Sequence, residues 1–99
     1  MKYQLVIQTR DSSLDAVIAL EDMITDLLNG TSEIDGHDFG SGEANIFIIT
    51  TKPESDCNAI KTALGQRLEK EKIKIAYRAL GSSEYISLYP KETENFKIK

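Results

Sequence analysis

Apolar and polar residues alternate along the first third of the chain with two periods, each typical of one kind of secondary structure. Residues 2–9 alternate with a period of two, which predicts a strand. Across residues 14–28 the apolar positions lie three or four residues apart, which predicts an amphipathic helix. Residues 11–13 (Asp-Ser-Ser) supply candidate N-caps for this helix, and the Asn-Gly pair at 29–30 is a typical helix end.

The next part of the chain, residues 31–51, predicts two strands joined by a tight turn. The Gly-Ser-Gly sequence at 40–42 can adopt positive φ without strain, so we expect a hairpin turn there. Residues 46–49 are apolar on both faces, which is typical of a central strand.

The second half of the chain predicts a helix over roughly residues 54–71, with Cys57 on its apolar side near its start. Residues 73–77 alternate as a further strand, and a turn at 80–84 leads to a short strand at 85–89 that Pro90 ends.

This order of elements predicts a single α+β domain over residues 1–90, followed by a polar tail over 91–99. A βαββαβ chain with a short C-terminal strand favours a two-layer ferredoxin-like plait, an antiparallel sheet with two helices on one face. The first and third strands would lie in its middle. Because helices cover one face only, we expect an interaction surface on the other face, serving a homodimer or a partner protein.

The residues on that uncovered face depend on the strand register. It would carry Val6 together with either Phe47 and Ile49 or Ile46 and Ile48. The alternative to an interface is that the tail folds back and covers this face with its two apolar residues, Phe96 and Ile98.

The composition of the chain indicates the cellular location of the protein and shows an uneven distribution of charge. The 99 residues are 40% apolar and 28% charged, an ordinary globular balance. The apolar runs are too short to cross a membrane, and the N-terminal residues predict a strand rather than a secretion signal. The single cysteine fits a reducing compartment. We therefore expect a cytoplasmic protein. We expect Cys57 to be a small buried hydrophobe rather than a reactive thiol.

The net charge of −4 is unevenly distributed along the chain. Residues 1–45 hold two bases and nine acids, 2 − 9 = −7, whereas residues 46–99 hold ten bases and seven acids, 10 − 7 = +3. The acidic half has no basic patch, which argues against binding to nucleic acid. An acidic face favours a basic protein partner or a cation, and its alternative interpretation is a solvated surface that keeps the protein soluble.

One polar segment concentrates the residues that could carry chemistry. It contains five candidate side chains within eleven residues: Asp35, His37, Asp38, Glu43 and Asn45. In a hairpin, Asp35 and His37 would share one face and Asp38 would point to the other, unless a bulge at Gly36 or Gly40 changes the register.

Three kinds of functional site use residues of these types, but the spacing of these five residues supports none of the three. A divalent metal could bind the carboxylates with His37, but the spacing fits neither a calcium loop nor a zinc signature. His37 could act as a base oriented by Asp35 or Asp38, but no activated nucleophile accompanies it. A phosphate at the glycines would be repelled by the carboxylates. We therefore expect no catalytic residue, no metal and no cofactor, and interpret the segment as a structural turn that presents an acidic recognition surface.

Three segments carry a resemblance to known proteins: YQLVIQ (residues 3–8), LED (20–22) and DGHDFGSGEANIFI (35–48). Together they resemble a group of small bacterial proteins described as uncharacterised, over roughly the first half of the chain. The resemblance implies a bacterial, ferredoxin-like domain and transfers no catalytic residue. In size and acidity the chain is also similar to some immunity proteins of contact-dependent inhibition and other toxin systems.

These observations lead to one functional expectation and two alternatives. We expect a non-enzymatic protein-binding module, exemplified by an immunity protein that neutralises a basic toxin domain. The first alternative is a small enzyme or ligand-binding domain centred on His37, Asp35 and Asp38. The second is a housekeeping homodimer joined through the open sheet face.

Overall fold

The computed structural model describes residues 1–30, 32–40 and 42–90, which form an α+β domain with a five-stranded antiparallel sheet, compatible with a two-layer plait. The sheet order is β2-β3-β1-β4-β5, so β1 is central and β2 is an outer strand. The strands are β1 (Tyr3–Thr9), β2 (Glu33–Gly40), β3 (Glu43–Thr50), β4 (Lys74–Ala79) and β5 (Ile86–Tyr89). The predicted tail over 91–99, with Phe96 and Ile98, lies outside the described residues.

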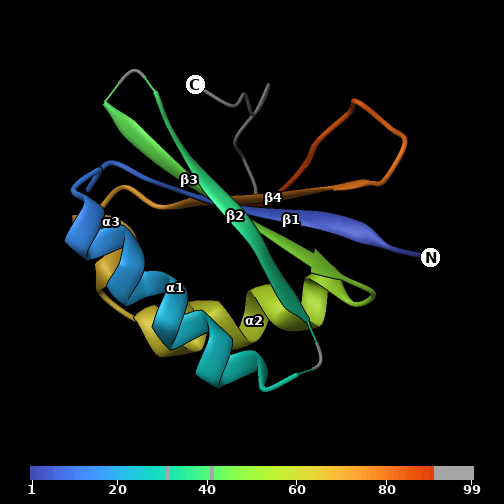
Figure 1. The fold of residues 1–99 in the computed structure, drawn as a ribbon, viewed down its shortest axis with the longest axis horizontal. Helices are drawn as coiled ribbons and strands as arrows, with labels where there is room; N and C mark the ends of the chain where they lie inside the picture. Colours follow the sequence, from blue (N-terminus) through green and yellow to red (C-terminus); the bar gives the residue numbers. More distant parts are fainter. Residues whose placement is uncertain (31, 41, 91–99) are drawn as a thin grey trace.

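Three helices lie on one side of this sheet (Figure 1): α1 (Leu14–Leu28), α2 (Pro53–Leu64) and α3 (Arg67–Lys70). The predicted bounds of α1 are confirmed: the Ser13 hydroxyl accepts a hydrogen bond from the backbone N–H of Ala16, and Asn29 adopts the left-handed conformation at the C-cap. The single predicted helix over 54–71 is wrong in its second half, because α2 ends at Gly65, where φ is +53°. A short helix, α3, follows instead.

The core lies between the sheet and the helices. On β1, Leu5 pairs with Ile48 and Ile7 pairs with Ile46, so these four side chains share the helix-facing side. They pack against the buried stripe of α1, formed by Val17, Leu20, Ile24 and Leu28, and against residues of α2 that include Cys57, Ile60 and Leu64.

The same register decides which residues lie on the opposite face of the sheet. Val6 pairs with Phe47 on β3 and with Ala76 on β4, and Gln4 pairs with Ile49. The alternative with Phe47 and Ile49 is therefore the observed one. Val6 is buried and Phe47 and Ile49 are partly buried, so these positions do not form a broadly exposed apolar surface.

Within the described ranges, no helix has the length and apolar character needed to cross a bilayer.

Candidate functional site

The polar segment from Asp35 to Asn45 forms the β2–β3 hairpin at one edge of the sheet. The predicted hairpin is confirmed: Gly40 and Glu43 are the last paired residues before the turn. Gly42 has φ of +77°, a conformation that a side chain disfavours, whereas Ser41 lies outside the described residues.

A bulge in β2 orients the candidate side chains. The pairing between β2 and β3 shifts between Ile34 and Gly36, and Gly36 has φ of +137°. Asp35 occupies the bulge and is exposed. Beyond it, His37 pairs with the core residue Ile46 and so lies on the helix-facing side, whereas Asp38 pairs with Asn45 on the opposite face.

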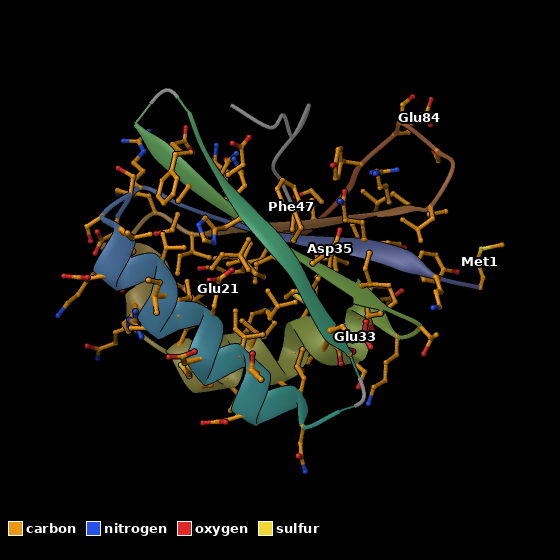
Figure 2. The ribbon with its side chains drawn as sticks, viewed as in Figure 1. Met1, Glu21, Glu33, Asp35, Phe47 and Glu84 are labelled. Carbon is orange, nitrogen blue, oxygen red and sulfur yellow. The ribbon has the colours of Figure 1, made fainter. Side chains whose placement is uncertain are left out.

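His37 contacts a carboxylate that sequence reasoning missed. Its Nδ1 atom lies 3.0 Å from Oε2 of Glu21 on α1, so the partner comes from the helix rather than from Asp35 or Asp38. Figure 2 shows Glu21 between α1 and β2. A signal for this position does exist, because Glu21 follows Val17 by four residues and precedes Ile24 by three, which places it beside the apolar stripe.

The remaining candidates separate into buried and exposed groups. Asn45 is buried, and its Oδ1 atom accepts a 2.9 Å hydrogen bond from Nε2 of Gln8. Glu43 is also buried. Asp38 is exposed, and its Oδ1 atom accepts a 2.9 Å hydrogen bond from the neighbouring backbone N–H of Phe39. The hairpin thus presents Asp35 and Asp38 to solvent and keeps Glu43 and Asn45 inside the fold.

No three His, Cys, Asp or Glu side chains of the described chain come together in a metal-binding arrangement. The Glu21 carboxylate lies within hydrogen-bond distance of Nδ1 of His37 and so orients the imidazole ring.

The uneven distribution of charge along the chain becomes an uneven distribution of charge over the surface of the folded protein. Residues 11–51 contain nine acids and no lysine or arginine. They include α1 and β2, which contact each other at one side of the molecule (Figure 1). We call this surface the acidic edge, and its exposed acids are Asp15, Asp22, Asp26, Glu33, Asp35 and Asp38. Lys2 and Arg10 flank β1, and five further basic residues lie on the later elements, namely Lys61, Arg67, Lys70, Lys74 and Arg78.

A second polar cluster joins the start of β2 to the start of α2. Asp56 is 2% exposed, and its Oδ2 atom accepts hydrogen bonds from Thr50 Oγ1 at 2.6 Å and from Ser32 Oγ at 2.5 Å. Thr50 Oγ1 in turn accepts a 3.0 Å hydrogen bond from the backbone N–H of Lys52. This cluster ties together three chain segments, so its role is structural.

Cys57 is buried among the core residues of α2, as predicted. Burial raises the pKa of its thiol, since removal from water disfavours the thiolate; Lys61 opposes this effect and Glu54 adds to it. Only the thiolate reacts readily with disulfide reagents.

We expect Cys57 to react slowly with a disulfide reagent at pH 8 in the folded protein and rapidly in urea. Because the pKa of Cys57 in the folded protein lies above that of an unburied thiol, the contribution of the thiol to stability is fully present below the unfolded pKa and is lost as pH rises through the folded pKa. The pH dependence of the free energy of unfolding is measured by urea unfolding between pH 7 and 10. The Cys57→Ala variant is the control, and an equally steep alkaline loss in both proteins would contradict this prediction.

The described residues thus place an acidic surface on a helix that packs on the core and on a strand paired with β3. No family model matches this chain, and no curated protein or solved structure matches it significantly.

Proposed function

We propose that this protein is a non-enzymatic protein-binding module that recognises a basic partner, and that it serves as an immunity protein against a bacterial toxin domain in the cytoplasm. The observation that carries the proposal is the acidic edge, on which α1 and β2 expose six carboxylates and carry no lysine or arginine.

Physical reasons support this assignment. Carboxylates gathered on one side of a protein attract a basic partner during diffusion and orient it before contact. Those of the acidic edge belong to a helix packed on the core and to a strand paired with β3, so binding requires little ordering of the backbone. A domain of this size can neutralise a toxin by covering its active site, which requires no catalytic residue of its own.

We propose further that the fold is a ferredoxin-like plait extended by one edge strand. The order β2-β3-β1-β4 supports this proposal, since it places the first and third strands of a βαββαβ chain in the middle, with β5 added beside β4.

The experiment compares binding to the product of the adjacent gene before and after part of the acidic edge is neutralised. We expect D22N/D35N/D38N to slow association at least about tenfold at low salt, because long-range attraction is lost. The control is E69Q/E84Q, which removes exposed acids elsewhere and should bind like the wild type. Association rates at two salt concentrations and protection of growth are the measurements. A neighbouring product with neither affinity nor toxicity would count against the immunity role.

A further inference from the structure

The acidic edge also contains exposed apolar side chains, which an acidic surface does not require for solubility. Leu14 and Ile18 on α1 are 56% and 44% exposed, and Phe39 on β2 is 42% exposed. We call these three residues the apolar strip.

A chain of contacts connects the two parts of the strip. The ring of Phe39 packs edge-on against the ring of His37, with 5.3 Å between their centroids. His37 in turn contacts Glu21 on α1 at 3.0 Å. At 3.6 residues per turn, Leu14, Ile18 and Glu21 fall within a sector of roughly 60° of the helix surface. The side of α1 that faces β2 therefore carries Leu14 and Ile18.

Carboxylates lie beside the strip. Asp15 and Asp22 come next around the outer surface of α1, and Asp38 precedes Phe39 on the exposed edge strand, on the opposite face of the sheet. An apolar centre with a charged rim is the arrangement found in protein–protein interfaces, where a few central side chains account for most of the binding energy.

We propose that the apolar strip is the anchor point of a docking surface for a cationic amphipathic segment of a partner protein. Apolar side chains of that segment cover Leu14, Ile18 and Phe39, while its lysines or arginines face the carboxylates beside the strip. The inference rests on the proposed function and specifies the chemistry of the partner and the residues that hold it.

Charge decides against a second copy as the occupant. Two copies joined strip to strip would bring the exposed acids of both acidic edges together, and residues 11–51 offer no lysine or arginine to offset them. Like charges placed opposite each other across an interface oppose binding. A basic segment would instead meet the opposite charges of Asp15 and Asp22 beside the strip.

The experiment uses three fluorescent peptides as probes: an 18-residue leucine–lysine amphipathic helix, a scrambled isomer of the same composition, and a leucine–glutamate analogue. Anisotropy at 150 mM salt measures each dissociation constant. We expect the wild type to bind the leucine–lysine helix at least about tenfold more tightly than its scrambled isomer, and the glutamate analogue not at all. The protein variant I18A/F39A should lose at least about tenfold of this affinity.

The chain offers a matched control for that variant. Leu80 and Ile86 are 45% and 53% exposed and lie after β4 and at the start of β5, away from the acidic edge. The variant L80A/I86A should bind the leucine–lysine helix like the wild type. Circular dichroism checks that both variants are folded, and Phe39→Leu, which keeps an apolar side chain, should retain most of the affinity.

Each other outcome overturns the inference and can be distinguished from failure of the proposed function. If the scrambled peptide binds equally well, or if I18A/F39A binds like L80A/I86A, charge alone drives binding; the acidic-edge proposal then survives provided that D22N/D35N/D38N weakens it. If no peptide binds, the strip is not a docking surface for such segments. If sedimentation shows a wild-type dimer that I18A/F39A dissociates, the occupant is a second copy.

Discussion

Replacing Asp56 by alanine is expected to lower the free energy of unfolding by about 3 kcal/mol, the largest loss that we predict for a polar side chain of this protein. The carboxylate is buried and accepts the hydroxyl hydrogens of Thr50 and Ser32. Hydrogen bonds to a charged group contribute more than neutral ones, and alanine would leave both hydroxyls without this acceptor.

The matched control for Asp56 lies two residues earlier on the same helix. Glu54 is an exposed acid in the first turn of α2, so Glu54→Ala removes a similar charge near the helix N-terminus without emptying a buried site. Urea unfolding of both variants provides the comparison. Equal losses in the two variants would show that the cluster contributes nothing beyond its charge, and Asp56→Asn, which keeps one acceptor oxygen, should fall between Asp56→Ala and the wild type.

The second prediction concerns the buried amide pair on the other face of the sheet. Asn45→Ala is expected to cost about 2 kcal/mol of unfolding free energy, because the buried Nε2 group of Gln8 loses the acceptor that lies 2.9 Å away. Replacing both amides by apolar side chains of similar shape, in Q8M/N45L, should cost less than the sum of the two single changes.

The double-mutant cycle from Q8M and N45L is measured by urea unfolding, and the expected coupling is about 1 kcal/mol. Strictly additive losses would show that the two amides act independently. The result also bears on function. Asn45 belongs to the candidate recognition segment, yet it is buried in the structure, so a folded Asn45→Ala protein should bind the leucine–lysine helix like the wild type.

The elements with a clear periodicity were predictable from the sequence, and the failures have identifiable causes. The bounds of α1 follow from an apolar stripe between a serine N-cap and an Asn-Gly end, both local signals. The break at Gly65 was missed because Leu64 and Leu68 keep helical spacing across it and a charged run follows. A glycine in that conformation ends the helix regardless of the pattern around it.

The candidate site was predictable as a segment but not as an arrangement. The glycine-rich sequence predicted a hairpin, and the alternation of residues placed His37 and Asp38 on opposite faces. A bulge at Gly36 was one of two positions that the sequence left open, whereas the contact between His37 and Glu21 was not predicted. The pairing of β2 with β3 selected Gly36, and the contact joins residues 16 positions apart through the packing of α1 on the sheet.

The sequence by itself determined which residues of α1 face the core, since burial must follow the period of a helix, whereas the faces of β3, which is apolar on both, were decided by the strand register. It also determined that residues 11–51 carry acid without lysine or arginine. Only the tertiary structure decided that α1 and β2 meet at one edge, where their acids lie beside Leu14, Ile18 and Phe39. The physical reason is that periodicity is a local property of the chain, whereas a surface forms from distant segments and depends on the register and packing that bring them together.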